Sequence, residues 1–244
     1  MARRPGLLVL NGGDEFKPGN EPQDRLLAEA AGRGPAYVVP TAAARQRPEQ
    51  AVGNARAWFG GLGLELQELP VLARRDAQDP RLAELAAGAG LFYLVGGDPG
   101  LVARVLRRTP VWAAMAGAWT AGAALAGSSA GAMALCSHTL IRATWPDRTQ
   151  RRPEPALAVV PGTAVLPHYN TFGQRWIDSA REAVPDLLLL GLDERTAAVW
   201  GESGWRVAGA GRVTVIRAGP ATAFAAGEAV RGLARPQQPD ADQP

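Results

Sequence analysis

Cysteine and histidine are almost absent from this sequence, and their scarcity removes several classes of chemistry. The only cysteine, Cys136, cannot form an internal disulfide, which favours a reducing compartment. With His138 and His168 as the only histidines, the chain lacks the ligands of a Cys/His zinc site. A carboxylate site for Mg²⁺ or Ca²⁺ stays open, but no EF-hand loop is present. We therefore expect no metal and no other cofactor.

Lysine is also scarce, because Lys17 is the only lysine among 26 basic residues. The arginines are spread along the chain among acidic residues, and the net charge of +3 is small for 244 residues. Short pairs such as Arg151-Arg152 are more typical of solvated faces than of a nucleic-acid footprint. The sequence therefore predicts no nucleic-acid partner.

Long hydrophobic runs are missing as well, since no stretch approaches the ~20 apolar residues that a membrane helix needs. The residues Met1 to Pro5 resemble the charged start of a signal peptide. The apolar run that follows, Leu7 to Leu10, is short, and Asn11-Gly12-Gly13-Asp14 ends it. We read this run as a buried strand and expect a cytoplasmic protein without a membrane segment.

What the chain does contain is an alternation of short apolar runs with longer helical patterns. This alternation is typical of an α/β fold with a mostly parallel sheet flanked by helices on both faces. The expected strands are Gly6–Leu10, Ala36–Val39, Leu64–Leu69, Gly90–Val95, Ala121–Ala126, Ala164–Pro167 and Leu187–Leu192. The expected helices are Gln23–Ala31, Pro48–Leu62, Pro80–Ala87, Pro99–Arg107, Ser129–Ser137 and Gln174–Val184.

The pattern changes after Asp193. Three short segments rich in β-branched or aromatic residues predict a C-terminal antiparallel meander at one edge of the sheet: Ala197–Trp200, Trp205–Ala208 and Val213–Ile216. No linker is visible, so we expect a single domain over residues 1–233. The polar, proline-rich residues 234–244 predict a disordered tail.

The sequence Gly127-Ser128-Ser129-Ala130-Gly131 fits the G-x-S-x-G pattern of a nucleophile elbow. Such a turn joins a strand to a helix so tightly that only small neighbours fit, and the serine projects at the helix N-terminus. An expected strand precedes the motif and an expected helix follows it. The alternative is a chance match in a chain rich in glycine and alanine, but the context favours Ser129 as a nucleophile.

A serine nucleophile needs a base, most often histidine. His138 lies nine residues beyond Ser129, on the same expected helix or just past it, and is better explained as a structural residue. His168 directly follows the expected strand Ala164–Pro167. Sites in open α/β sheets form outside the carboxyl ends of strands, so His168 is the predicted base.

The histidine must itself be oriented, usually by a carboxylate. Asp193 and Glu194 follow the next expected strand, Leu187–Leu192, and either could accept the imidazole N–H. The alternative is that this acidic pair only flanks a turn. Its position at another strand end favours a role in the site.

The turn Gly96-Gly97-Asp98-Pro99 also follows an expected strand and exposes backbone N–H groups. Together with the N–H of Ala130, it would form an oxyanion hole. The alternative is a phosphate-binding turn. The segment lacks the Lys-Ser/Thr of a P-loop and the spacing of G-x-G-x-x-G, so nucleotide binding has little support.

Taken together, four segments resemble the dipeptidase E / cyanophycinase family of serine peptidases, and the resemblance covers roughly residues 6–232. They are Leu94-Val95-Gly96-Gly97-Asp98, Gly127-Ser128-Ser129-Ala130-Gly131-Ala132, Pro167-His168-Tyr169 and Gly191-Leu192-Asp193-Glu194-Arg195-Thr196-Ala197. The resemblance implies a flavodoxin-like fold similar to class I glutamine amidotransferases, with serine where those enzymes carry cysteine. It also suggests a homodimer.

The resemblance further implies roles for individual residues. Ser129 would be the nucleophile, His168 the base and Glu194, rather than Asp193, the third member of the triad. Gly97 and Ala130 would supply the oxyanion-hole amides. We expect substrate contacts from Asp98, Asn170 and Arg175, with Arg175 binding a carboxylate through its guanidinium fork.

Two departures from the family concern the substrate. The loop after His168 is shorter than the one with which dipeptidase E recognises an N-terminal aspartate. Leu166-Pro167 stand where cyanophycinases carry Asp-Gln. Neither specificity therefore transfers directly to this chain.

We expect a serine peptidase that hydrolyses short peptides, among them Asp-containing dipeptides, through an acyl-enzyme. One alternative is a cyanophycinase-like exopeptidase that acts on a β-aspartyl-arginine polymer. Others are an esterase or amidase, or a non-catalytic ligand-binding protein, on the same fold.

Overall fold

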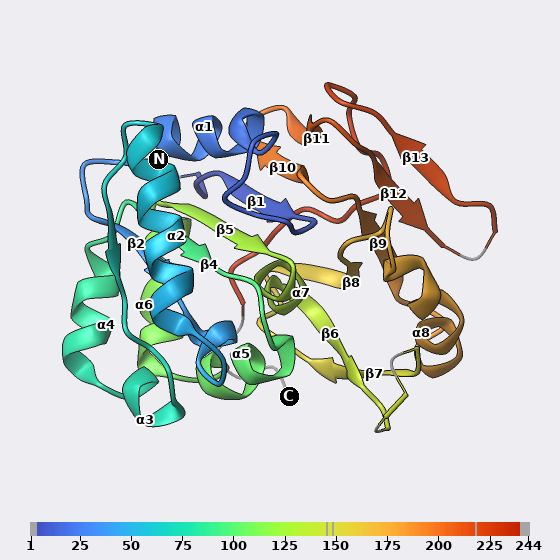
Figure 1. Ribbon diagram of the computed structural model, residues 1–244, viewed down its shortest axis with the longest axis horizontal. Coiled ribbons are helices and arrows are strands. Elements are labelled where there is room, and N and C mark those ends of the chain that lie inside the picture. The colour runs from blue at the N-terminus through green and yellow to red at the C-terminus, as the bar shows by residue number, and fades with distance from the viewer. Residues whose placement is uncertain (1–3, 145, 148, 218, 240–244) are drawn as a thin grey trace.

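Two β-sheets form the framework of the molecule. The structure is a computed structural model that describes residues 4–144, 146–147, 149–217 and 219–239. Within these residues the first sheet has seven strands in the order β11-β10-β1-β5-β4-β2-β3. The second has six strands in the order β13-β12-β9-β8-β6-β7. Figure 1 shows the first sheet and most of the helices on the left and the second sheet, with α8, on the right.

The first sheet comprises β1 (Leu8–Asn11), β2 (Ala36–Val39), β3 (Leu66–Glu68), β4 (Leu91–Leu94), β5 (Ala124–Ser128), β10 (Thr196–Gly201) and β11 (Gly204–Gly209). The second comprises β6 (Cys136–Arg142), β7 (Arg151–Pro155), β8 (Val160–Leu166), β9 (Leu188–Leu192), β12 (Val213–Ile216) and β13 (Thr222–Phe224). The helices are α1 (Glu21–Ala30), α2 (Pro48–Gly61), α3 (Arg74–Ala77), α4 (Pro80–Ala87), α5 (Pro99–Leu106), α6 (Pro110–Thr120), α7 (Ala130–Leu135) and α8 (Ile177–Ala183), with 3₁₀ turns η1 (Thr41–Ala43) and η2 (Gly173–Trp176).

The first sheet is covered on both faces. Successive strand residues point to opposite faces, and the core divides accordingly. Val9 packs in a cluster with Leu27 of α1 and Phe59 of α2. Leu8 and Leu10 belong to the larger cluster, which includes residues of α4 to α7 and of the second sheet. The predicted α/β fold, with a mostly parallel sheet and helices on both faces, is confirmed.

Several helices begin at a capping residue followed by proline. Asp79, Asp98 and Thr109 each accept a backbone N–H of the first turn through their side-chain oxygen, and Pro80, Pro99 and Pro110 follow them. Proline costs nothing at this position because its missing N–H would have no partner inside the helix. These pairs explain why three of the helix starts are so sharply defined.

The meander that we expected at one sheet edge is instead shared between the two sheets. Strands β10 and β11 pair antiparallel with β1 and close the first sheet, whereas β12 and β13 extend the second sheet beyond β9. The expectation of one sheet is therefore corrected. The chain crosses from the first sheet to the second directly after α7, returns after β9 and crosses again between β11 and β12. The first two crossings lie beside residues that we predicted to be functional.

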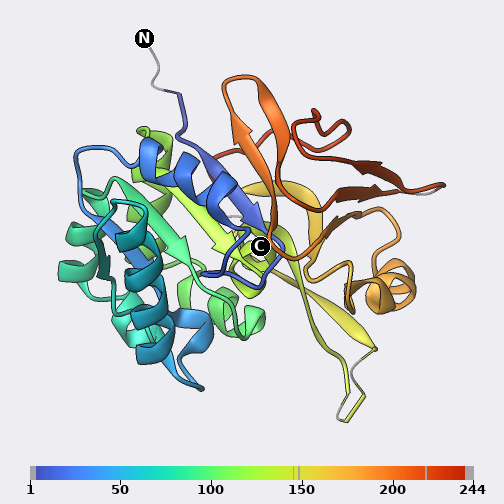
Figure 2. The same cartoon turned by 45° about the horizontal axis from the view of Figure 1, so that its top comes forward.

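Some elements were not expected. The helix predicted over Ser129–Ser137 ends at Leu135, and β6 begins at the next residue. Its antiparallel partner β7 reads RRPEP, which fits an exposed edge strand because proline and charge both discourage further pairing. Figure 2 shows β6 and β7 running out from the body of the molecule. Helices α3 and α6 were also missed.

The expected tail lies partly outside the described residues, since 240–244 are not among them. The carbonyl of Ala234 accepts the Trp205 Nε1–H at 2.8 Å, and the Gln237 N–H donates to Val159 O at 2.9 Å. Pro236 is buried. Residues 234–239 are therefore placed against both sheets. Among the described helices, none has both the length and the apolar character needed to cross a bilayer.

Candidate active site

The expected elbow joins β5 to α7, and its glycines are required by close packing. A Cβ on Gly127 would lie 2.4 Å from the Gly131 carbonyl carbon, and one on Gly131 would lie 2.3 Å from Leu94 O. Neither distance is possible for a real side chain. Between them Ser129 adopts φ 48° and ψ −107°, a conformation that non-glycine residues rarely occupy. The predicted strand–turn–helix context is confirmed.

Ser129, His168 and Glu194 meet in space. The Ser129 Oγ lies 3.1 Å from His168 Nε2, and His168 Nδ1 lies 2.8 Å from Glu194 Oε1. With the ring proton on Nδ1 donating to Glu194, Nε2 is left to accept the serine proton. The side chains of His168 and Glu194 are 20% and 28% exposed, so the pair is shielded but reachable. This geometry permits proton transfer from a serine hydroxyl.

The three residues do not follow strands of one sheet, as we had expected. Ser129 follows β5 of the first sheet, whereas His168 and Glu194 follow β8 and β9, which are parallel neighbours in the second. The site therefore forms where the two sheets meet.

Of the two neighbouring acids, only Glu194 contacts the histidine. Asp193 turns to the next loop, where its Oδ2 accepts the Arg212 N–H at 2.8 Å. Asn170 holds Glu194 in place, because its Oδ1 accepts the Glu194 N–H at 2.9 Å. Sequence reasoning alone left Asp193 and Glu194 as alternatives, and the contacts separate them.

Gly97 and Ala130 flank the nucleophile from two segments. Gly97 has φ 143°, and a Cβ there would lie 2.2 Å from Ala42 O, so only glycine fits. Neither its N–H nor that of Ala130 donates to another residue in the described part of the chain. The adjacent Gly96 faces the serine, since a Cβ on Gly96 would lie 3.5 Å from Ser129 Cβ. Both amides are thus available for an oxyanion.

The loop after β1 connects these pieces, and sequence reasoning missed it. The Asn11 carbonyl accepts the Ser129 N–H at 3.0 Å, that of Gly12 accepts the His168 N–H at 2.7 Å, and that of Gly13 accepts the Arg195 N–H at 3.0 Å. A Cβ on Gly12 would lie 2.1 Å from Asp193 O. The signal was the Gly-Gly pair at the end of a strand, which we had interpreted only as the end of an apolar run.

Charged side chains fasten the same loop. Asp14 accepts Arg195 Nε–H at 2.7 Å and also binds Lys17. The hydrogen bond from Lys17, followed by that from Arg195, lowers the pKa of Asp14. Glu15 contacts both Gly96 and Ser128. Because Arg195 is next to Glu194, the Asp14 ion pair also restrains the acid of the site.

The three expected substrate contacts differ in their surroundings. Asp98 caps α5 through Leu101 N–H and lies 3.6 Å from Arg104, so its carboxylate already has partners. Asn170 is occupied at Oδ1 by Glu194. Arg175 is exposed on η2, and no ion pair joins its guanidinium to another described residue. Of the three, Arg175 is the most available to a ligand.

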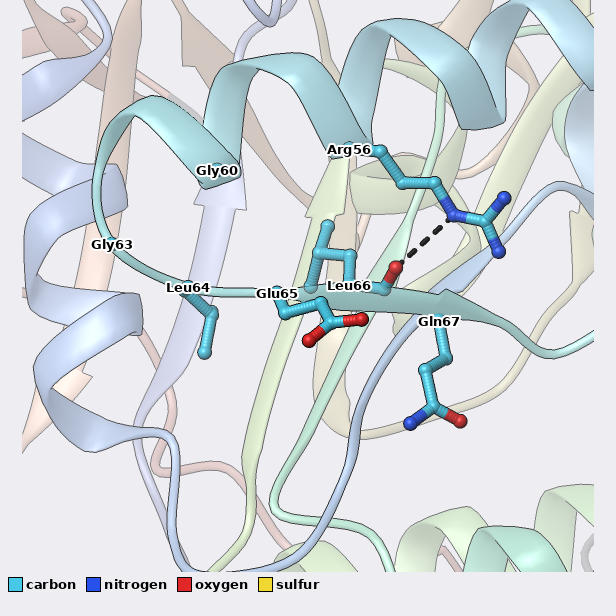
Figure 3. A pocket seen from close by; sticks show the side chains of 7 residues that line it. All are labelled: Arg56, Gly60, Gly63, Leu64, Glu65, Leu66 and Gln67. Carbon is cyan, nitrogen blue, oxygen red and sulfur yellow. Dashed lines mark hydrogen bonds between the residues drawn. The ribbon is translucent and has the colours of Figure 1, made fainter.

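The molecule has cavities both near this site and away from it. One of about 460 Å³ borders Gly96, the residue before Gly97, and is lined by Gln46, Arg47, Gln50 and Asn54. Another of about 600 Å³ lies at the outer edge of the first sheet, where Arg56 Nε donates to Leu66 O at 3.1 Å. Figure 3 shows the lining of this edge cavity, which contains no serine and no histidine: Arg56, Gly60, Gly63, Leu64, Glu65, Leu66 and Gln67.

The third cavity, of about 640 Å³, contains the other histidine. His138 lies on β6, not on a helix, and its Nδ1 is 3.2 Å from Ser137 Oγ. That serine hydroxyl donates to Thr163 O at 3.0 Å and also accepts the Thr163 N–H. Burial lowers the pKa of His138. Ser137 therefore joins β6 to β8 through its hydrogen bonds with Thr163, which gives the Ser137–His138 pair a structural role. Ser129 does not line this cavity.

Metal ligands do not gather anywhere in the described ranges, because no three His, Cys, Asp or Glu side chains lie close enough to hold an ion. Cys136 is fully buried, and burial raises the pKa of its thiol.

The chain is similar to known proteins over most of its length. The model of a family described as Peptidase family S51 matches residues 7–207. A cyanophycinase of Trichormus variabilis is 31% identical over 226 residues, covering 88% of this chain and 74% of the relative. A cyanophycinase of Synechococcus elongatus is 29% identical over 220 residues, covering 86% of this chain and 68% of that protein.

Solved structures resemble the fold as a whole. The crystal structure of a peptidase from an acI-B1 Actinobacterium superposes with a TM-score of 0.81 at 33% identity, covering 94% of this chain and 98% of that one. A putative peptidase E protein from Listeria monocytogenes has a TM-score of 0.55 at 17% identity, covering 91% and 98%. The second likeness concerns the fold alone.

Proposed function

The chain belongs to peptidase family S51 and is a serine-type peptidase, and from that premise we propose that it hydrolyses short peptides through Ser129, His168 and Glu194. The observation that carries the proposal is the continuous hydrogen-bond path from Ser129 Oγ to His168 Nε2 (3.1 Å) and from His168 Nδ1 to Glu194 Oε1 (2.8 Å). We further propose that the protein works in the cytoplasm.

In the first half of the reaction, Ser129 Oγ attacks the peptide carbonyl carbon while its proton passes to His168 Nε2. Glu194 accepts the Nδ1–H throughout and stabilises the imidazolium that forms. The carbonyl oxygen becomes an oxyanion and accepts hydrogen bonds from the backbone N–H groups of Gly97 and Ala130. Collapse of this intermediate breaks the C–N bond, and His168 returns the proton to the leaving amine.

In the second half, water attacks the acyl-enzyme. His168 Nε2 takes a proton from the water, the oxyanion forms again at the same two amides, and collapse releases the acid product. Ser129 recovers its proton from His168. The strained turn at Ser129 keeps the hydroxyl at the helix N-terminus, where backbone dipoles favour negative charge.

The substrate is proposed to carry a carboxylate close to the scissile bond. Two arginines support this: Arg175 is exposed on the turn that follows His168, and Arg47 lines the cavity next to Gly96. A guanidinium binds a carboxylate with two parallel hydrogen bonds. Dipeptides that contain aspartate meet this requirement. The β-aspartyl-arginine linkage of a cyanophycin-like polymer is the second candidate, favoured by the cyanophycinase relatives.

The test is a hydrolysis panel of Asp-containing dipeptides, neutral dipeptides, a β-aspartyl-arginine dipeptide and simple esters. Wild type is compared with Ser129→Ala and with Ser137→Ala, which removes the hydroxyl of the other Ser–His pair. We expect peptide turnover in wild type and Ser137→Ala and its loss in Ser129→Ala. Unchanged turnover in Ser129→Ala would overturn the proposal.

Two further outcomes separate the alternatives. Turnover of esters without turnover of any peptide would indicate an esterase. A fluorophosphonate that fails to label Ser129 would indicate a binding protein without catalysis.

A further inference from the structure

Glu15 bridges the two segments that flank the nucleophile. Its Oε1 accepts the Gly96 N–H at 2.9 Å, and its Oε2 accepts the Ser128 Oγ–H at 2.8 Å. Gly96 directly precedes Gly97, and Ser128 directly precedes Ser129. One carboxylate therefore joins residues that are neighbours, in sequence, of a proposed oxyanion donor and of the proposed nucleophile.

We propose that Glu15 is a positioning residue that sets the distance between the Gly97 and Ala130 amides, an inference that rests on the proposed function. Its contacts involve neither the Ser129 hydroxyl nor the His168 imidazole, so it acts through the two segments that carry Gly97 and Ser129. An oxyanion hole requires donors held about 2.7–3.1 Å from the developing charge, and removing one donor costs ~10²–10³ in rate. A contact that holds the two segments at a fixed distance should therefore raise kcat.

The sheet itself cannot provide this brace. β4 and β5 are parallel neighbours whose last paired residues are Leu94 and Gly127. Gly96 lies two residues beyond that pair and Ser128 one residue beyond it. The strand ends diverge there, one into the Gly96-Gly97 turn and the other into the elbow. Glu15 links them just past the point at which the β4–β5 ladder stops.

The brace has its own anchor. Asp14, the residue before Glu15, is bound to Arg195, and its carbonyl accepts an Asn20 Nδ2–H at 2.9 Å. The approach to Gly96 is close, since a Cβ there would lie 2.8 Å from Glu15 Oε1. The loop, the carboxylate and the glycine thus form one rigid arrangement rather than a chance surface contact.

The substitution Glu15→Gln tests whether the hydrogen bonds of Glu15 or its negative charge are required. In Glu15→Gln the amide oxygen accepts the Gly96 N–H, and the amide NH₂ donates to Ser128 Oγ, so both bridges persist without a negative charge. Glu15→Ala removes both. Ser128→Ala removes only the Ser128 bridge and is a milder change in case Glu15→Ala does not fold. Glu21→Ala is the matched control, because Glu21 Oε2 accepts the Gly19 N–H in the same loop without touching either segment.

Three measurements apply to each variant: kcat and KM on the peptide of the panel that wild type hydrolyses fastest, the rate of Ser129 labelling by a fluorophosphonate, and backbone hydrogen exchange over residues 94–98 and 127–131. We expect Glu15→Ala to lower kcat and the labelling rate at least about tenfold with little change in KM. Exchange should rise in both segments together. Ser128→Ala should raise it chiefly in 127–131. Glu15→Gln and Glu21→Ala should stay close to wild type.

The proposal is overturned if Glu15→Ala leaves kcat and exchange unchanged, if Glu15→Gln is as defective as Glu15→Ala, or if KM alone rises, which would make Glu15 a substrate ligand. If Glu15→Ala does not fold, unchanged exchange and kcat in Ser128→Ala overturn it. If wild type neither turns over peptides nor is labelled, the proposed function fails. Hydrogen exchange then still decides whether Glu15 holds the two segments.

Discussion

Glu194 lies 2.8 Å from His168 Nδ1, whereas its neighbour Asp193 points to a different loop and binds the Arg212 N–H. Two adjacent carboxylates thus have separate tasks. Both acids lie in the connection from β9, which ends at Leu192, to β10, which begins at Thr196.

This division predicts different outcomes for two conservative substitutions. Glu194→Gln replaces an acceptor by an amide that can present its NH₂ to the imidazole and favour the wrong tautomer. We expect kcat to fall by about 10²–10⁴. Asp193→Asn keeps an oxygen for Arg212 and should leave kcat close to wild type. Steady-state kinetics on both variants decide, and an equal loss in Asp193→Asn would contradict the assignment.

A second prediction concerns Gly13, which lies against the imidazole. A Cβ there would be 2.4 Å from His168 Cε1, and its φ is 116°. Gly13→Ala should displace the ring and abolish most turnover. Gly63→Ala is the matched control, because Gly63 has φ 84° but no atom near its Cβ position. It should cost about 1 kcal/mol of stability and leave kcat unchanged.

Turnover and urea unfolding of the two glycine variants separate clash from backbone strain. If Gly13→Ala and Gly63→Ala lose stability equally and both keep full kcat, the contact between Gly13 and the ring has no catalytic importance.

A third prediction concerns Phe172, whose ring stacks on His168 with centroids 4.8 Å apart and an interplanar angle of 21°. Phe172 is 39% exposed, although such a side chain is usually buried. Stacking of this kind is worth about 0.5–1.5 kcal/mol, so Phe172→Ala should lower kcat by up to about tenfold through a less ordered imidazole. Phe172→Tyr should retain activity.

The control for Phe172 is Leu85→Ala on α4, which removes another exposed hydrophobic side chain, 47% exposed. Its kcat should equal that of wild type. A rise in KM without a fall in kcat for Phe172→Ala would assign the ring to substrate binding instead.

The sequence predicted the parts of the site that obey local rules. The elbow was recognisable because Gly127 and Gly131 must be small, and His168 because it follows a strand. The brace at Glu15 was not, since its partners are 81 and 113 residues away and nothing local pairs them. For the same reason the division into two sheets was missed.

Two missed elements have different causes. Helix α6 buries Val111, Trp112, Met115 and Trp119, but its other face carries mainly alanine and glycine, so no polar face marks it as an amphipathic helix. Strand β7 contains two prolines and two arginines, which argue against a strand unless it lies at an edge. In both α6 and β7, the position of the segment in the fold determines its secondary structure, and the local sequence pattern does not reveal it.

A fourth prediction concerns Asp24 of α1, which is fully buried. Burial raises the pKa of this carboxyl to about 7, and the nearby Glu15 and Glu21 add to the shift. Its Oδ2 accepts the Trp58 Nε1–H at 2.8 Å, but Oδ1 has no partner within the described residues. The neutral form of Asp24 is therefore preferred in the folded protein below about pH 7.

The sign of the pH dependence follows from this preference. Between about pH 4 and pH 7 the folded protein keeps the Asp24 proton and the unfolded chain has lost it, so stability falls as the pH rises. The shift in the pKa of Asp24 sets an upper bound of ~4 kcal/mol on this loss of stability.

Asp24→Asn carries no such proton and should be more stable than wild type at pH 8, with the difference vanishing near pH 4. Urea unfolding at several pH values measures this, with the exposed Asp186→Asn as control. If the free energy of unfolding of Asp24→Asn and of wild type changed with pH in parallel, the pKa of Asp24 would not be raised by folding. Asp24 would then be ionised in the folded protein at neutral pH, which contradicts the prediction.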